Sequence, residues 1–254
     1  YFLSNASKKL RVTHYTANEF NYDTPDWLGD TTVVITASLG GTTPETVKAN
    51  GVAAAAGATV ISLTHAAGSA LDTSAHYSIV HGFEANYAAK LEKMGYAMAL
   101  ALELVQQVEG YDKYEQMLAG FDKIFEVCEN AARSARKAAK KFAEQYKDAP
   151  VVYIMSSGAS AEVAYSSSIC LMMEMQWINS GNFHDGEFFH GPFEIVEKDV
   201  PFILLMNDGK TRPMDSRALD FLQRFGALTT VVDAKDYALA NAASSDVITY
   251  FDPL

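Results

Sequence analysis

Short segments rich in β-branched and apolar residues alternate with helical patterns along most of this chain. Apolar runs of this length suit parallel strands that are buried on both faces, and the segments between them suit the helices that cover such sheets. We therefore expect an α/β fold of doubly wound parallel sheets in three-layer αβα sandwiches. The predicted strands are Arg11–Tyr15, Thr32–Ala37, Thr59–Leu63, Val151–Met155, Phe202–Met206, Thr229–Asp233 and Val247–Tyr250. The predicted helices are Pro44–Ala56, Tyr87–Val108, Tyr111–Tyr146, Ala161–Asn179 and Met214–Phe225.

The sequence also repeats weakly at an offset of about 169 residues, as when Gly57–Leu63 is compared with Gly226–Val232. Three such pairs in the same order favour two copies of one unit, although small α/β units also resemble one another by coincidence. The copies would be residues 1–86 and 148–254, and residues 87–147 would form connecting helices. The opening strand and the closing helix of the unit have no counterparts in the sequence, so we expect a chain trimmed at both ends.

An excess of acidic over basic residues limits the partners that this chain can bind. Asp and Glu number 31 against 20 Lys and Arg, which gives a formal net charge of -11. Such a surface repels phosphate backbones and disfavours nucleic-acid binding. The one basic segment, Arg133–Lys147, has helical spacing and is interpreted as the solvated face of a long helix rather than as a binding patch.

The cysteines and the hydropathy indicate an ordinary cytoplasmic protein. Cys128 and Cys170 lack the paired spacing of a zinc site, and nothing in the sequence suggests an oxidising compartment. No apolar run approaches the length that crosses a bilayer, and the first residues lack a signal-peptide pattern. We therefore expect a cytoplasmic location and no membrane partner.

One acidic residue, Glu174, lies inside an apolar helical run, and His190 follows it in a Phe-Phe-His-Gly-Pro turn just after a second acid, Glu187. An isolated carboxylate is costly to bury, so such a group is either paired or has a raised pKa that suits it to proton transfer. A structural glutamate that is satisfied by arginine or by backbone N–H groups stays an equal alternative. The neighbours of Glu174 at helical spacing are all apolar: Cys170, Leu171, Trp177 and Ile178.

A loop of small hydroxyl and glycine residues connects the predicted strand Thr32–Ala37 to the helix that Pro44 opens. Backbone N–H groups in such a loop can approach an anion, and the helix N-terminus adds positive potential. The loop has neither the Walker lysine nor a GxGxxG fingerprint, and an ordinary N-capping loop is the competing interpretation. Its place after a parallel strand favours ligand binding. The candidate phosphate-binding residues are Ser38, Gly40, Gly41, Thr42 and Thr43.

The loop, the repeat and the Glu174/His190 pair together resemble the sugar isomerase (SIS) domain family, and its fructosamine-6-phosphate deglycase branch in particular. The resemblance extends through most of the chain and is clearest in Ala37–Ala49, Cys170–Ser180, Gly186–Ile195 and Asn207–Gly226. It implies two SIS units, each with a parallel sheet in an αβα sandwich, and a homodimer. Regulators that carry SIS domains usually have one unit and an attached DNA-binding domain.

The resemblance also implies roles for individual residues. Glu174 matches the acid that moves a proton between C1 and C2 of the open-chain sugar. His190 matches the histidine that assists ring opening, commonly at the site of the partner subunit, with Glu187 in a supporting place. Ser38 and Thr43 match phosphate-binding hydroxyls. Two positions depart from relatives: Gly40 stands where the family usually has serine, and Leu171 stands where the glucosamine-6-phosphate synthase has lysine, which argues against that synthesis.

The resemblance implies hydrolysis of a 6-phosphorylated fructosamine, an Amadori adduct of an amino acid, into glucose 6-phosphate and the free amino acid, and the residues above suit this chemistry. Ring opening, C1/C2 proton transfer and imine hydrolysis require neither a metal nor a redox cofactor. The nearest alternative is an aldose–ketose phosphosugar isomerase, which shares the first proton transfer. A non-catalytic phosphosugar-binding regulator is a further alternative of a different class.

Overall fold

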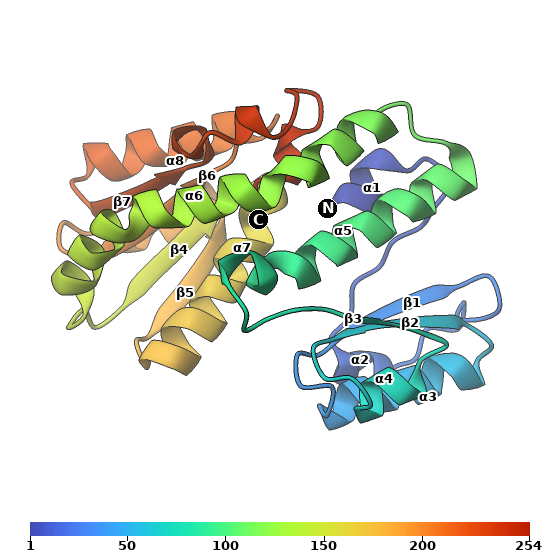
Figure 1. Cartoon of the computed structure of the whole chain (residues 1–254). Helices are drawn as coiled ribbons and strands as arrows, with labels where there is room; N and C mark the ends of the chain where they lie inside the picture. Colours follow the sequence, from blue (N-terminus) through green and yellow to red (C-terminus); the bar gives the residue numbers. More distant parts are fainter. The chain divides into compact units, whose positions relative to one another are not determined.

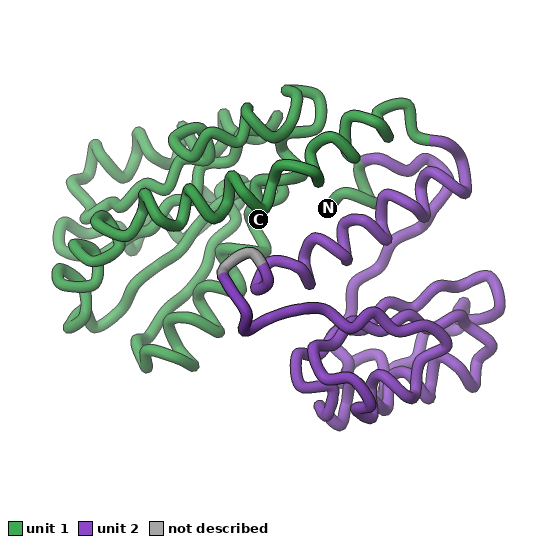
Figure 2. Tube along the Cα trace, viewed as in Figure 1, with its two compact units in different colours: residues 1–5, 111–254 green, residues 6–110 purple. Residues whose placement is uncertain are grey.

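The computed structural model describes residues 1–86 and 89–254, and it divides into two compact units (Figures 1 and 2). One unit comprises Ala6–Gly110, and the other combines Tyr1–Asn5 with Tyr111–Leu254. We call them the N-terminal unit and the C-terminal unit. The predicted boundaries at residues 86/87 and 147/148 stay predictions, and the first two residues of the predicted connecting helices, 87 and 88, lie outside the described residues.

The N-terminal unit contains a parallel sheet with the strand order β1-β2-β3. Helices α2, α3 and α4 lie together on one side of this sheet (Figure 1), and small side chains let α3 approach closely: Ala49 and Ala53 pack with Phe20, Ala58 and Val60 in one core cluster. The elements are β1 (Val33–Ala37), β2 (Thr59–Thr64), β3 (Tyr77–Val80), α2 (Ala17–Tyr22), α3 (Pro44–Ala55), α4 (Ala70–Ser74) and α5 (Tyr87–Glu109).

The C-terminal unit contains a parallel sheet with the order β5-β4-β6-β7, covered by helices on both faces. Because side chains alternate along a strand, Phe202 and Leu204 of β6 pack with Ala218 of α8, whereas Ile203 packs with Ala164 of α7 on the other face. The main elements are β4 (Val152–Ser156), β5 (Ser180–His184), β6 (Pro201–Met206), β7 (Leu228–Asp233), α6 (Tyr114–Tyr146), α7 (Ala161–Ser166) and α8 (Arg212–Arg224).

Several short helical elements complete the chain. They are α1 (Phe2–Ala6), a π-helix η2 (Ser167–Met175) that continues α7, and the 3₁₀ turns η1 (Gly158–Ser160), η3 (Phe188–His190), η4 (Pro192–Ile195), η5 (Ala234–Tyr237), η6 (Leu239–Asn241) and η7 (Ile248–Tyr250).

The predicted α/β fold with parallel sheets and covering helices is confirmed, and two predicted strands are wrong. Arg11–Tyr15 is irregular and mostly exposed, without a neighbouring strand among the described residues. In place of Val247–Tyr250 the chain forms the 3₁₀ turn η7 (Ile248–Tyr250), and the Tyr250 N–H donates to the Val247 carbonyl at 3.0 Å. The sequence prediction missed β3 and β5. Strand β3 has only four residues, and β5 begins with the weak strand formers Ser180 and Gly181.

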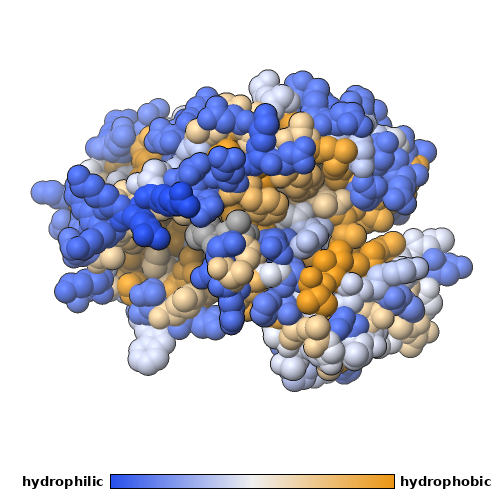
Figure 3. Space-filling view, viewed as in Figure 1, coloured by the Kyte–Doolittle hydropathy of each residue, from blue (hydrophilic) through white to orange (hydrophobic). Residues whose placement is uncertain are grey.

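The basic segment of α6 is a solvated helix face, as predicted. Arg133, Lys140 and Lys147 are all exposed, and Arg133 and Lys140 pair with acids one helical turn away. Figure 3 shows hydrophilic atoms over this end of α6. Within the described ranges 1–86 and 89–254, no helix combines the length and the apolar character that crossing a membrane requires.

Candidate active site

The predicted phosphate loop lies where β1 ends and α3 begins, at the carboxyl edge of the N-terminal sheet. The Ser38 and Thr43 hydroxyls are 2.7 Å apart and share a hydrogen bond. Thr43 occupies the N-cap position of α3, yet its side chain caps no helix N–H in the described part of the chain. Thr43 is therefore the N-cap residue by position, as the competing interpretation expects, but its hydroxyl bonds to Ser38 instead of capping the helix. Phosphate binding by this loop stays a prediction.

Close contacts with the end of β2 fix the shape of this loop. The Thr64 hydroxyl and the His65 N–H both donate to the Leu39 carbonyl, at 3.1 and 3.0 Å. Gly41 has a φ of 62°, and a Cβ there would lie 2.8 Å from the Thr64 hydroxyl oxygen. Only glycine satisfies both constraints without strain, so the loop approaches its neighbours as closely as backbone allows.

A buried amide supports the strand and the helix that flank the loop. Asn50 of α3 is fully buried, and its Oδ1 accepts from the Thr36 hydroxyl of β1 at 2.8 Å. Its Nδ2 donates to the hydroxyls of Ser62 and Ser74, each at 2.9 Å. The sequence analysis missed this network; a polar residue amid the alanines of α3 was the available signal.

Glu174 lies near the end of the π-helix η2 in the C-terminal unit, and its side chain is exposed. The expected apolar burial is therefore wrong. The prediction assumed α-helical spacing, but a π-helix bonds residue i to i+5 and turns different neighbours toward the carboxylate. Several apolar residues close to it in the sequence are exposed as well, from 41% for Met173 to 91% for Trp177.

The turn η3 presents Glu187 and His190 on one short segment of the same unit. The Glu187 N–H donates to the His184 carbonyl and the His190 N–H to the Glu187 carbonyl, both at 2.8 Å. Phe188 between them is fully buried in the core against α8, whereas Glu187 and His190 are exposed. An aromatic anchor thus holds the turn while its polar residues face outward.

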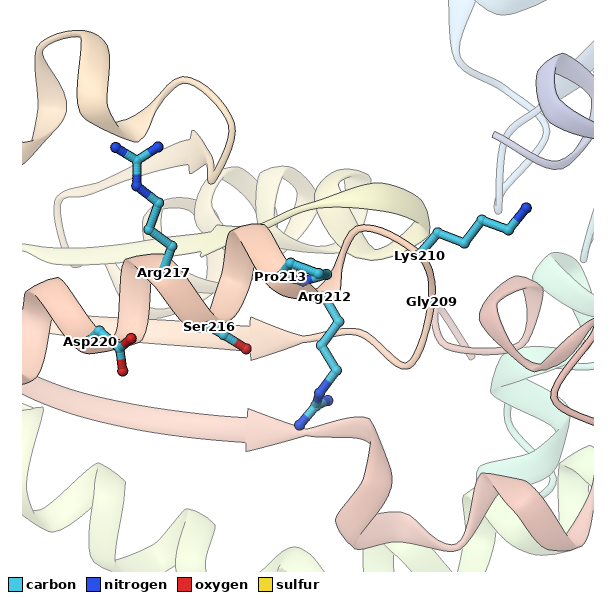
Figure 4. Close-up of a pocket in the computed structure, with 7 residues that line it drawn as sticks. All are labelled: Gly209, Lys210, Arg212, Pro213, Ser216, Arg217 and Asp220. Carbon is cyan, nitrogen blue, oxygen red and sulfur yellow. The ribbon is translucent and has the colours of Figure 1, made fainter.

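The structure places the candidate residues in two groups. Ser38, Gly40, Gly41, Thr42 and Thr43 belong to the N-terminal unit, and Glu174, Glu187 and His190 belong to the C-terminal unit. A pocket of about 650 Å³ lies at the start of α8 and contains none of them; its lining includes Lys210, Arg212 and Arg217. In Figure 4 these cationic side chains diverge, and Arg212 points toward β7, where its Nη1 donates to Asp233 at 2.8 Å.

The carboxyl edge of the C-terminal sheet holds a polar cluster that the sequence analysis missed. The fully buried Asp215 accepts from the backbone N–H of Asn207 at 2.9 Å and from its side-chain amide at 2.6 Å, and also from the Ser157 hydroxyl. Burial, and to a smaller extent the negative charge of Asp215, raises the pKa of Asp185 to about 9. On β7, the hydrogen bond from Arg212 lowers the pKa of Asp233.

Comparisons with known proteins identify the family, although no protein-family model matches the chain. A Bacillus subtilis (strain 168) protein named fructosamine deglycase FrlB is 39% identical over 254 residues, which is 100% of this chain and 77% of that protein. The fructoselysine 6-phosphate deglycase of Escherichia coli (strain K12) is 26% identical over 231 residues, covering 91% of this chain and 67% of the relative.

Solved structures agree with this assignment. A Salmonella typhimurium LT2 structure, named as a candidate phosphosugar isomerase, matches with a TM-score of 0.96 and 41% identity over 99% of this chain and 76% of that one. The C-terminal domain of glucosamine-fructose-6-phosphate aminotransferase from Francisella tularensis shares the fold, with a TM-score of 0.73 and 13% identity over 93% of this chain and 71% of that one. This chain therefore belongs to the fructosamine-6-phosphate deglycase branch of the sugar isomerase (SIS) family.

Proposed function

We propose that this protein deglycates 6-phosphorylated fructosamines and releases glucose 6-phosphate and a free amine. The observation that carries the proposal is the 39% identity to a fructosamine deglycase along the whole chain. The candidate residues supply the chemistry: a hydroxyl-rich anion loop for the phosphate, a carboxylate for proton transfer and an imidazole near a second carboxylate.

In this proposal the phosphate binds to the loop Ser38–Thr43. The Ser38 and Thr43 hydroxyls exchange their mutual hydrogen bond for bonds to phosphate oxygens, and the Thr42 hydroxyl adds a third donor. Gly40 and Gly41 leave the backbone accessible, and the N-terminus of α3 contributes its positive potential. Binding of this remote group holds the reacting carbons in position, so that binding energy serves the proton-transfer steps.

The reacting end of the substrate is assigned to Glu174, Glu187 and His190. His190, supported by Glu187, assists the opening of the sugar ring to the C2 ketone. Glu174 removes a proton from C1 to form an enaminol and returns a proton to C2, which leaves a C1 imine. Water adds to this imine, and the amine departs as the C1 aldehyde of glucose 6-phosphate forms. Proton transfer by a positioned side chain contributes about 10²- to 10⁴-fold.

We further propose a homodimer in which two subunits share each active site. Large apolar residues close to Glu174 in the sequence are exposed in the single chain: Leu171 by 49%, Met175 by 65% and Trp177 by 91%. Exposed apolar side chains grouped in this way favour a protein partner. We also propose that each compact unit corresponds to one SIS unit. The expected cytoplasmic location stays a prediction.

A product assay separates the proposed deglycase from its alternatives. The purified protein is incubated with 6-phosphorylated adducts of lysine, asparagine and glycine, and glucose 6-phosphate and free amine are measured independently. A deglycase releases both in equal amounts from at least one adduct. An aldose–ketose isomerase interconverts phosphosugars without releasing amine, and a regulator binds phosphosugar without turnover. Absence of amine release from every adduct contradicts the proposal.

A further inference from the structure

A cluster of aromatic rings holds the turn η3, which carries Glu187 and His190, against α8. Phe188 is fully buried, and its ring meets the Phe221 ring of α8 edge to face, with the ring centroids 5.7 Å apart. Phe189 meets Phe221 in the same way, with the centroids 5.5 Å apart. Helix α8 therefore binds both residues that directly precede His190 through one ring.

The chain returns to the same cluster after His190. Gly191 has a φ of 147°, which favours glycine, and the 3₁₀ turn η4 begins at the next residue. Phe193 of η4 then stacks on Phe189, with the ring centroids 6.5 Å apart and the ring planes 27° apart. Phe193 also meets Phe221 edge to face at 5.8 Å. The Phe189 ring thus links the chain before His190 to the chain after it.

Arg217 of α8 adds a cation to this cluster. Its guanidinium carbon lies 3.8 Å from the centroid of the Phe189 ring, well inside the distance of about 6 Å over which a cation is attracted to an aromatic face. The residue is exposed, and its side chain extends away from Arg212 (Figure 4). Arg217 forms no ion pair with the residues that the structure describes. The ring of Phe189, and not an acidic partner, therefore fixes where this guanidinium lies.

A guanidinium suits this place because the cluster is close to the surface. Phe189 and Phe193 are only partly buried, so an uncovered ring face would meet water. The planar face of an arginine side chain covers such a ring while the N–H groups at its edge stay hydrated. An uncharged side chain at position 217 covers the ring less well and loses the electrostatic attraction.

We propose that Arg217 is a positioning residue for deglycation: its stack on Phe189 holds the turn that places His190 for ring opening. The proposal rests on the proposed function, because it assigns to that reaction a residue that acts through Phe189 and does not contact the substrate. When the stack is lost, the turn departs from α8 more often, and His190 is in its productive position in fewer molecules.

The first test compares the wild-type protein with Arg217→Met, which keeps a long apolar side chain but has no charge. An exposed cation–π contact changes an equilibrium by about two- to fivefold, so we expect kcat to fall by about two- to fivefold while KM changes little. The matched control is Arg224→Met. Arg224 is exposed on the same helix, and its guanidinium carbon lies 5.7 Å from the ring of Phe225, which is outside the turn.

Arg224→Met should keep the wild-type kcat. Urea unfolding of both variants shows that the rates refer to folded protein, so a general loss of stability does not imitate the expected change in kcat. A wild-type kcat in Arg217→Met overturns the proposal. A loss confined to KM overturns it as well, because Arg217 would then bind the substrate.

A double-mutant cycle tests whether Arg217 acts through the ring. Phe189→Leu removes the aromatic face and should lower kcat at least as much as Arg217→Met does. In the double variant, Arg217→Met should cause no further loss, because its partner ring is already absent. A further loss of about two- to fivefold in the double variant contradicts the proposal, since Arg217 would then act independently of Phe189.

Hydrogen exchange of residues 187–193 reads the same support without catalysis, and it decides the matter if Phe189→Leu does not fold. Exchange should be about two- to fivefold faster in Arg217→Met and unchanged in Arg224→Met. If exchange follows this pattern while no adduct releases amine, the support of the turn stands and the proposed deglycase fails. If amine is released but exchange in Arg217→Met equals that of the wild type, the deglycase stands and the role of Arg217 fails.

Discussion

Replacing Gly41 by alanine tests whether the phosphate loop requires a residue without a side chain. Gly41 has a φ of 62°, and this left-handed conformation costs an L-residue about 1–2 kcal/mol. A Cβ would also lie 2.8 Å from the Thr64 hydroxyl oxygen and would overlap Ser69, and overpacking of this kind costs about 1–3 kcal/mol. We therefore expect Gly41→Ala to lower the free energy of unfolding by about 2–5 kcal/mol.

Two other glycines separate the conformational cost of Gly41→Ala from its steric cost. Gly68 has a φ of 74° and open space where a Cβ would lie, so Gly68→Ala should cost only the conformational part, about 1–2 kcal/mol. Gly51 lies inside α3 with open space beside it, and Gly51→Ala should stabilise the protein by about 0.5–1 kcal/mol. The difference between Gly41→Ala and Gly68→Ala measures the steric contact with β2 and α4.

Urea unfolding of the N-terminal unit provides the assay. The chain has two tryptophans, and Trp27 belongs to this unit, so its fluorescence in a Trp177→Phe background follows the N-terminal unit alone. Inorganic phosphate should raise the thermal midpoint of the parent and of Gly68→Ala more than that of Gly41→Ala, because the displaced loop binds phosphate less well. Equal losses of stability in Gly41→Ala and Gly68→Ala refute the steric reasoning.

Three further predictions follow from the buried groups. Asn50→Ala removes the buried hydrogen bonds to Thr36, Ser62 and Ser74, and it should lower the free energy of unfolding by about 1–3 kcal/mol in urea titrations; no measurable loss contradicts a structural role for the network. Arg217→Ala removes the contact with Phe189 and should lower kcat with little effect on KM, whereas a change confined to KM argues for substrate binding instead. Burial raises the pKa of Asp252 above its value in the unfolded chain, so the wild type should lose stability as the pH rises, by up to about 1.4 kcal/mol per pH unit between pH ~4 and ~7. Unfolding curves across this range should show that Asp252→Asn lacks this part of the slope. An unchanged slope in Asp252→Asn contradicts the prediction.

Local sequence patterns predicted the strands whose apolar side chains pack against the covering helices. The apolar runs that became β2, β4 and β6 satisfy both strand propensity and burial. Strand β5 has no such pattern, because it begins with Ser180-Gly181-Asn182. Pairing with β4 holds it instead, and the Ser180 hydroxyl donates to the Val152 carbonyl at 2.6 Å. Tertiary contacts of this kind are not visible in a local window of sequence.

The candidate site was predictable to the same degree. Hydroxyl and glycine residues after a strand indicated the anion loop, and the structure shows Ser38 and Thr43 in contact there. The burial expected for Glu174 was wrong because the chain continues α7 as a π-helix, which no residue pattern announced. The hydrogen bond from the Ser157 hydroxyl to Asp215 joins positions that are distant in sequence, so it becomes visible only when the end of β4 and α8 are folded against each other.

The rate of glucose 6-phosphate release by Glu174→Gln tests the central claim most directly. The amide preserves the size of the side chain but cannot accept a proton from C1, so we expect kcat to fall about 10²-fold or more while KM changes little. Glu162→Gln, which alters another exposed acid on the preceding helix α7, should keep the wild-type rate. A Glu174→Gln protein that releases glucose 6-phosphate and amine within a few-fold of the wild-type rate would show that another group moves the proton.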